Sequence, residues 1–274
     1  MTLLQAIFLG ILQGLTEFLP ISSSGHLVIT QHYFEGFHQP GVLFDVLLHA
    51  GTLSAVLIYY RKDIVDILRS FTTKLDVRGC RQDDDCDNYH VQRRLALLII
   101  VGTIPTALIG YLFRDYVRVL FTSVTFTATM LIVTGILLAV ADRIKEPKRK
   151  VKSLTFRDSV IIGFVQGLSI TPGISRSGST IATGLLRKID GEGAAKFSFL
   201  LSIPAILGAV VLEIPDVSRI KACEISAYLL GPLSAMLTGI LAIKFLIRVL
   251  RQERLRYFAY YCWLVGLVVI VLNV

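Results

Sequence analysis

The sequence predicts an all-α integral membrane protein, built as an inverted-topology repeat with six transmembrane helices and two re-entrant helical hairpins. Three observations predict this fold class. The 274 residues are 54% hydrophobic with a mean hydropathy of +0.67, above the roughly 45–50% apolar content of soluble domains. The other two are an internal repeat and an alternation of charge between successive connections. We expect a single membrane domain over 1–274.

The internal repeat places a polar stretch at 13–26 opposite a similar one in the second half. A shift of 153 residues aligns the identical pairs Gly10/Gly163, Gln13/Gln166, Gly14/Gly167, Leu15/Leu168, Ile21/Ile174, Ser22/Ser175, Ser24/Ser177, Gly25/Gly178 and Thr30/Thr183. Where the first copy has Ser23, the second has Arg176, so one copy offers an acid, Glu17, and the other a base. The chain therefore divides into repeat one at 1–142, a basic linker at 143–156 and repeat two at 157–274.

Each repeat begins with an apolar segment that is broken in the middle. Residues 3–30 are interrupted by Pro20, which disfavours a helical residue before it, and by serines, which favour helix N-termini. We expect one helix to end near Pro20 and another to start after the serines. Residues 158–186 repeat the pattern with Pro172 and Gly173 at the break. Irregular backbone at membrane depth is tolerated only in protein or beside a wet cavity, which favours re-entrant hairpins.

Three predicted spans follow each hairpin, since several apolar runs approach the ~20 residues of a membrane helix. They are 42–60, 94–113, 124–142, 194–213, 226–247 and 257–273. A polar loop with an acidic run at 83–87 is expected over 61–93. Lys and Arg are concentrated at 61–93, 143–157, 187–196 and 244–256, whereas 114–123 and 214–225 hold two each. The positive-inside rule therefore places both termini outside, and three spans per repeat invert the second copy.

Two charged side chains lie inside these apolar segments. Glu17 and Arg176 would each cost roughly 2.5–3.5 kcal/mol if left unpaired at the membrane centre, so we expect them to meet near the midplane, where inverted repeats join. Hydroxyl residues and glycine precede a helix in both copies, which favours anion binding at the helix N-terminus. Hydroxyls, arginine and histidine suit a phosphate, whereas Glu17 suits a general base or a ligand for a divalent cation.

The two polar stretches resemble the signature motifs of the undecaprenyl-pyrophosphate phosphatase family, the bacitracin-resistance membrane phosphatases. Gln13 and Glu17 match its Glu/Gln followed by Glu four residues on, 20–26 match its Pro-x-Ser-Ser-x-Gly-His stretch, and 172–180 match Pro-Gly-x-Ser-Arg-Ser-x-x-Thr. The resemblance covers essentially the whole chain. It implies hydrolysis of a polyprenyl pyrophosphate to the monophosphate, which recycles the lipid carrier for peptidoglycan synthesis at the cell (inner or plasma) membrane.

The resemblance also implies roles for single residues. Glu17 would activate the nucleophile, Ser23 or a water; His26 would protonate the leaving group or orient Ser23; and Arg176 would hold the phosphate. A divalent cation, Mg²⁺ or Ca²⁺, is implied with Glu17 as its ligand, although Gln13 stands where a second carboxylate would complete such a site. The predicted substrate-binding residues are Gln13, Ser22, Ser24, Ser175, Ser177 and Thr180.

Other interpretations stay open. A lipid flippase or secondary transporter is the competing function, because inverted repeats with broken helices are typical of transporters. A second class of membrane lipid phosphatase needs a histidine downstream of Arg176, and the sequence has none there. His49, on the first span, is assigned to packing or polar lining, and Asp45 is left undecided. The expected partners are the lipid substrate and membrane lipids, with no nucleic acid; small residues on the spans permit a homodimer.

Overall fold

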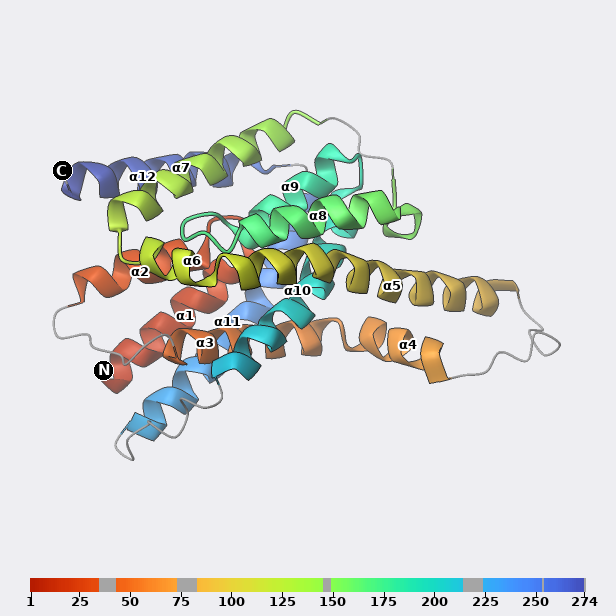
Figure 1. Cartoon of the computed structure of the whole chain (residues 1–274), viewed down its shortest axis with the longest axis horizontal. Coiled ribbons are helices and arrows are strands. Elements are labelled where there is room, and N and C mark those ends of the chain that lie inside the picture. Colours follow the sequence, from red (N-terminus) through yellow and green to blue (C-terminus); the bar gives the residue numbers. More distant parts are fainter. Residues whose placement is uncertain (35–42, 73–82, 145–148, 214–223, 253, 274) are drawn as a thin grey trace.

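The computed structural model describes residues 1–34, 43–72, 83–144, 149–213, 224–252 and 254–273, which are helical apart from turns and one isolated bridge (Figure 1). Most of the predicted connection at 214–225 lies outside the described residues. The helices of the first half are α1 Leu3–Phe18, α2 Ser23–Tyr33, α3 Leu43–Tyr59, α4 Arg61–Thr72, α5 Asp83–Leu112, α6 Arg114–Leu120 and α7 Val124–Ala141. Those of the second half are η1 Val151–Ser153, α8 Phe156–Leu168, α9 Arg176–Leu186, α10 Gly191–Glu213, α11 Ile225–Leu250 and α12 Arg256–Asn273.

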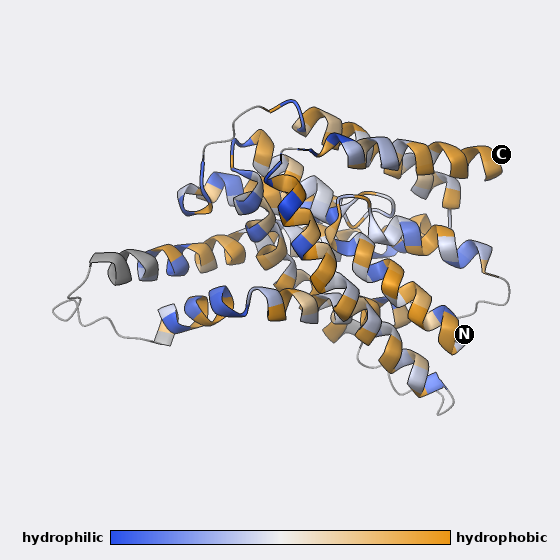
Figure 2. Cartoon of the chain, turned by 180° about the vertical axis from the view of Figure 1, so that it is seen from behind, coloured by the Kyte–Doolittle hydropathy of each residue, from blue (hydrophilic) through white to orange (hydrophobic). Residues whose placement is uncertain are grey.

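Five helices among the described residues, α5, α7, α10, α11 and α12, are long and apolar enough to cross a membrane. α3 meets the same criterion only together with α4, from which a bend of 77° separates it. Each of the six predicted spans overlaps one of these helices, and α5 begins well before the span predicted at 94–113. Their outward faces are apolar (Figure 2), and Leu108, Val211 and Leu264 are each more than half exposed. Soluble proteins rarely expose apolar surface on this scale, so we infer that membrane lipid contacts these helix faces.

Proline breaks both apolar segments where the sequence predicts. α1 and α2 lie on either side of Pro20, and α8 and α9 lie on either side of Pro172. Ser22 and Ser175 are the N-caps of α2 and α9, and each hydroxyl accepts a backbone N–H of the first turn, at 3.2 and 3.0 Å. The second helix of each pair therefore starts within the serine cluster rather than after it, because these hydroxyls replace the missing helical acceptors.

The polar loop predicted over 61–93 is wrong for the described residues. α4 occupies Arg61–Thr72, and α5 begins at Asp83, so the acidic run belongs to a helix. α4 forms because Ile64 and Ile67 recur at helical spacing and pack against the core despite the charges around them. A short helix, α6, likewise occupies most of the connection predicted at 114–123.

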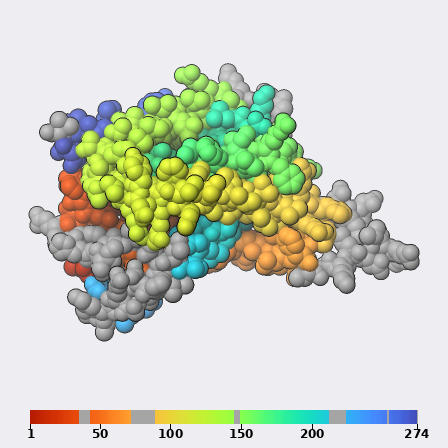
Figure 3. All heavy atoms as spheres, viewed as in Figure 1, coloured from red at the N-terminus to blue at the C-terminus, as the bar shows by residue number. Residues whose placement is uncertain are grey.

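Glycines let the broken helices lie close against neighbouring spans. α1 crosses α11, where a Cβ added at Gly10 would lie 2.2 Å from the carbonyl oxygen of Gly231. α8 crosses α5, where a Cβ at Gly163 would lie 2.0 Å from the carbonyl oxygen of Gly102. In Figure 3, α5 runs across the visible face with α8 above it and α10 below. These close crossings place both breaks at the centre of the bundle.

A buried carboxylate ties the linker to the second half of the chain. Asp158, in the first turn of α8, is fully buried and accepts hydrogen bonds from Arg149 at 2.6 Å and Arg187 at 2.7 Å. Burial acts to raise the pKa of this carboxyl, but the hydrogen bonds from both arginines and from Thr155 outweigh it and hold the pKa well below its usual range. The two ends of the α8–α9 segment are thereby joined.

Candidate active site

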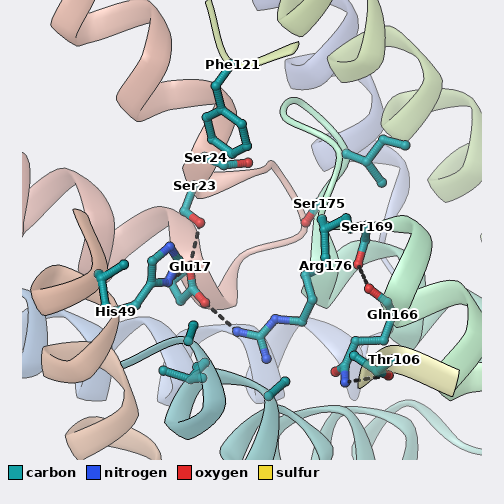
Figure 4. A pocket seen from close by; sticks show the side chains of 16 residues that line it. Glu17, Ser23, Ser24, His49, Thr106, Phe121, Gln166, Ser169, Ser175 and Arg176 are labelled. Atoms are coloured by element: carbon teal, nitrogen blue, oxygen red, sulfur yellow. Dashed lines mark hydrogen bonds and ion pairs between the residues drawn. The ribbon is translucent and has the colours of Figure 1, made fainter. Parts of the chain in front are cut away.

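A cavity of about 210 Å³ lies between the two breaks (Figure 4). Its polar lining comes from both halves of the chain: Glu17, Ser23, Ser24 and His49 from the first, and Gln166, Ser175 and Arg176 from the second. An apolar wall faces this lining, with Val46 on α3 and Ala205, Ile206 and Ala209 on α10. The cavity is therefore polar at its centre and apolar along one side.

Glu17, in the last turn of α1, is the most connected side chain of the cavity. It is only 5% exposed, and its Oε1 forms an ion pair with Nη2 of Arg176 (Figure 4). Its Oε2 accepts hydrogen bonds from Ser23 Oγ at 2.5 Å and from Gln13 Nε2 at 2.9 Å. The prediction that the acid of one copy meets the base of the other is confirmed. Each of the two charges is paired with the other, and this pairing offsets part of the free-energy cost of burying it.

The turn before Ser23 directs its hydroxyl toward Glu17. Ser22 adopts φ +67°, a left-handed backbone that only Ser22 and Lys188 adopt among the described non-glycine residues. Such a conformation costs about 1–2 kcal/mol for a residue with a Cβ. Ser23 follows at the start of α2, where its hydroxyl reaches back to the carboxylate. The strained residue Ser22 thus directly precedes Ser23, whose hydroxyl contacts the carboxylate.

Arg176 lines the cavity and keeps one terminal nitrogen without a hydrogen-bond partner among the described residues. It is the first residue of α9, and its side chain is 18% exposed. Nη2 pairs with Glu17, whereas Nη1 has no hydrogen-bond partner among the described residues. Because a guanidinium can bind two oxygens of an anion at once, Arg176 can hold Glu17 and a phosphoryl group together. Ser24 and Ser175, which also line the cavity, add hydroxyls beside it.

The structure does not bring His26 into the cavity lining. The ring is buried, with Nδ1 2.8 Å from the carbonyl oxygen of Ser22 and Nε2 2.8 Å from the hydroxyl of Tyr261. Both ring nitrogens therefore have protein partners. Of the two roles that the resemblance implies for His26, this geometry favours orientation of the turn that carries Ser23 over protonation of a leaving group.

Four other predicted residues lie behind the cavity and hold its lining in place. Gln13 binds Glu17, and Ser22 caps α2. Ser177 Oγ donates to the carbonyl oxygen of Leu19 at 3.1 Å, which joins the second break to the first. Thr180 Oγ1 donates to the carbonyl oxygen of Arg176 at 2.8 Å. Their positions are those of supports rather than of substrate ligands.

His49 takes the second of the two roles that the sequence leaves open for it, packing or polar lining. It lines the cavity, and its Nδ1 lies 3.0 Å from Gln13 Nε2 and 3.4 Å from Glu17 Oε2. It also lines an adjoining hollow with Gln31 and Asp45, whose side chains are hydrogen-bonded at 2.7 Å. The available signal was its place in an apolar span, because ionisable residues there are usually functional.

The residues around Glu17 do not form a site for a divalent cation by themselves. Both carboxylate oxygens have close partners in Arg176, Ser23 and Gln13, and position 13 offers an amide. Across the described parts of the chain, no group of three or more His, Cys, Asp or Glu side chains is arranged to hold a metal ion. A cation taking part in a reaction here would have to be held chiefly by the substrate.

Apolar spans around a buried carboxylate, hydroxyl and guanidinium define a multi-pass helical membrane protein with a polar centre suited to an anion. Comparison with known proteins identifies its family. Residues 6–268 match the family described as "Bacitracin resistance protein BacA", and the chain belongs to this family.

Relatives match over nearly the whole length. The chain is 45% identical over 266 residues to an undecaprenyl-diphosphatase of Syntrophotalea carbinolica, with 97% of each chain covered. It is 46% identical over 280 residues to one of Alkaliphilus metalliredigens, covering 100% of this chain and 99% of the relative. A third, from Methanobrevibacter smithii, is 42% identical over 273 residues, covering 98% and 97%. Both breaks and every cavity residue lie within these matches.

Proposed function

We propose that this protein hydrolyses undecaprenyl pyrophosphate to undecaprenyl monophosphate and phosphate, and so recycles the lipid carrier for cell-envelope glycan synthesis. The observation that carries the proposal is the contact of Glu17 with both Ser23 and Arg176 in one cavity. The name undecaprenyl-diphosphatase, borne by relatives that are 42–46% identical, supports the substrate. The apolar wall of α10 supports a lipid tail beside the reacting group.

Ser23 is the nucleophile that the geometry favours, because its hydroxyl already donates to Glu17 at 2.5 Å. In the first step Ser23 Oγ bonds to the terminal phosphorus, its proton passes to Glu17, and the bond from phosphorus to the bridging oxygen breaks. The prenyl monophosphate leaves. In the second step water attacks the phosphoserine, Glu17 returns the proton to Oγ, and phosphate leaves with the protons of the water. Direct attack by a water activated by Glu17 is the alternative.

Arg176 supplies the electrostatic part of this mechanism. Its guanidinium binds oxygens of the terminal phosphate and stabilises the charge that develops there, while Nη2 also holds Glu17. The hydroxyls of Ser24 and Ser175 add donors within the same cavity. Burial of Glu17 and Ser23 lowers the effective dielectric constant around them, which strengthens each of these interactions. His26, Gln13, Ser22, Ser177 and Thr180 position the groups that touch substrate.

The finer architecture follows from the same observations. α1 and α2 have 16 and 11 residues and α8 and α9 have 13 and 11, all shorter than the ~20 residues needed to cross. Each pair therefore enters and leaves the membrane on one side as a re-entrant hairpin. The matching crossings of α1 with α11 and of α8 with α5 support two inverted repeats.

Orientation is proposed from charge. Both termini lie at one end of the molecule (Figure 1). The junctions of the Lys- and Arg-rich connections gather at the other end, where Arg251 lies 3.1 Å from Glu192 and Lys196 lies 2.5 Å from Asp63. The positive-inside rule places that end in the cytoplasm. The termini and the opening of the first hairpin then face outward, toward carrier lipid released by glycan transfer.

Phosphate release from undecaprenyl pyrophosphate by the purified protein in detergent tests the function. We expect turnover by the wild-type chain and a loss of about 100-fold or more in Arg176→Ala, because the phosphoryl charge loses its main partner. Parallel assays with and without chelator measure the cation requirement. Movement of labelled lipid across liposomes without phosphate release would instead establish the flippase alternative.

A further inference from the structure

The tautomer of His26 follows from its two hydrogen bonds. The carbonyl oxygen of Ser22 can only accept, so Nδ1, 2.8 Å away, must carry the proton. Nε2 then has a lone pair, and the hydroxyl of Tyr261, also 2.8 Å away, donates to it. The two rings are parallel to within 8°, with centroids 5.6 Å apart. The hydrogen bonds run in one direction, from Tyr261 through His26 to the backbone of Ser22.

This chain of hydrogen bonds ends at the strained residue of the first break. Ser22 has φ +67° and immediately precedes Ser23. The same carbonyl oxygen also accepts the backbone N–H of His26 at 3.1 Å, so the ring N–H is the second of two donors that hold this strained peptide group. The direction of the Ser23 hydroxyl, which reaches Glu17 at 2.5 Å, depends on the same peptide groups. The ring of His26 is therefore placed to keep the Ser23 hydroxyl directed toward the Glu17 carboxylate.

A neighbouring residue of α12 makes a second contact with the same break. The thiol of Cys262, which is fully buried, lies 3.8 Å from the carbonyl oxygen of Pro20. Two consecutive residues of the last helix thus reach the first break, one through His26 and one directly. In the second break the corresponding support comes from α7, where Thr134 Oγ1 donates to the carbonyl oxygen of Gly173 at 3.0 Å and accepts from Ser175 N at 3.0 Å.

We propose that Tyr261 is a positioning residue of the active site, which fixes the tautomer and place of His26 and, through Ser22, the attack geometry of Ser23. This inference rests on the proposed phosphatase function and deepens it. Tyr261 touches no substrate. Its hydroxyl acts through a buried histidine that would otherwise be assigned to proton transfer, and it makes α12 part of the catalytic apparatus.

A double-mutant cycle with Tyr261→Phe and His26→Asn tests the proposal. Asn places a side-chain N–H near the position of Nδ1, so His26→Asn keeps the bond to Ser22 but has no group for Tyr261 to hold. We expect Tyr261→Phe to lower kcat about fivefold, the factor that one neutral hydrogen bond is worth, with KM unchanged. In the His26→Asn background the same change should have no further effect. The kcat of His26→Asn should be well above that of His26→Ala, because only the asparagine keeps the bond to Ser22.

Tyr260→Phe is the matched control, because Tyr260 is the preceding residue of α12 and its ring packs on Trp263 with centroids 5.9 Å apart. It should leave kcat unchanged. Nitrogen-15 NMR of the His26 ring in micelles gives a readout independent of turnover: we expect the Nδ1–H tautomer in the wild type and a mixture of tautomers in Tyr261→Phe.

The outcomes separate this proposal from the proposed function. A wild-type protein that releases no phosphate fails as a phosphatase, whereas the tautomer measurement still tests the contact. An active wild type whose kcat is unaffected by Tyr261→Phe overturns the positioning role. So does a His26→Asn variant as inactive as His26→Ala, since that result assigns proton transfer to His26.

Discussion

The two breaks in the broken helices reverse the chain in similar ways but with different residues. Between α8 and α9 the left-handed position is Gly173, at φ +89°, and a glycine adopts this without cost. Between α1 and α2 it is Ser22, at φ +67°, which needs His26 and α12 to hold it. The relaxed break presents Arg176, and the strained break presents Ser23. Of the two breaks, only the one that performs the attack is strained, and there the backbone direction decides whether Ser23 faces its base.

The two charged residues divide the chemistry in the same way. Glu17 is held by side chains from α1, α2 and α9 and offers its oxygens to a proton. Arg176 has one terminal nitrogen paired and one without a described partner, so it can still bind an anion. One copy of the repeat therefore supplies the base and nucleophile, and the other supplies the anion-binding group.

The strongest test of this division is Glu17→Gln. The amide keeps the shape of the side chain but cannot accept the Ser23 proton, so we expect kcat to fall about 10³-fold, within the range of general-base catalysis. KM should change little, because Arg176 still binds the phosphate. Steady-state phosphate release measures both constants. Near-normal kcat in this variant would contradict the assignment of Glu17 as the base.

A paired substitution compares the two breaks directly. Gly173→Ala puts a Cβ 2.1 Å from the carbonyl oxygen of Thr127 at a positive φ, and we expect a loss of about 3 kcal/mol of stability. Ser22→Gly removes strain at the left-handed position of the other break and loses only a few tenths of a kcal/mol as a cap. The melting temperature of Ser22→Gly in detergent should be no lower than that of the wild type. Its kcat should be lower. Equal destabilisation by both changes would show that the breaks do not differ in strain.

The smallest effect is expected at the carboxylate that joins the ends of the α8–α9 segment. The pKa of Asp158 is lowered in the folded state, so its contribution to stability is complete above the unfolded pKa of about 4 and is lost as the pH falls below it. Asp158→Asn should lose about 2 kcal/mol at pH 7 and respond less to acidification. Melting temperatures at pH 7 and at about pH 2.5, which lies below the unfolded pKa, measure this; identical pH responses of the two proteins would refute it.

The sequence predicts those features of the fold that depend on local pattern. Apolar run lengths predict the six spans, Pro20 and Pro172 predict the breaks, and the mirrored residues predict the meeting of Glu17 with Arg176. α4 was missed because charges mask the helical spacing of its apolar residues. The contact of His26 with Tyr261 could not be predicted from the sequence, because 235 residues separate the two and no spacing rule connects them.

The same long separation bears on how the protein is made. The ribosome synthesises the first break near the start of translation, but the contacts that hold it come from α12, 235 and 242 residues later. Membrane insertion of the last helix therefore completes the turn that begins the chain. Until that helix docks, the nucleophile has its base nearby but lacks the residues that fix its direction, so maturation of the catalytic centre coincides with the end of assembly.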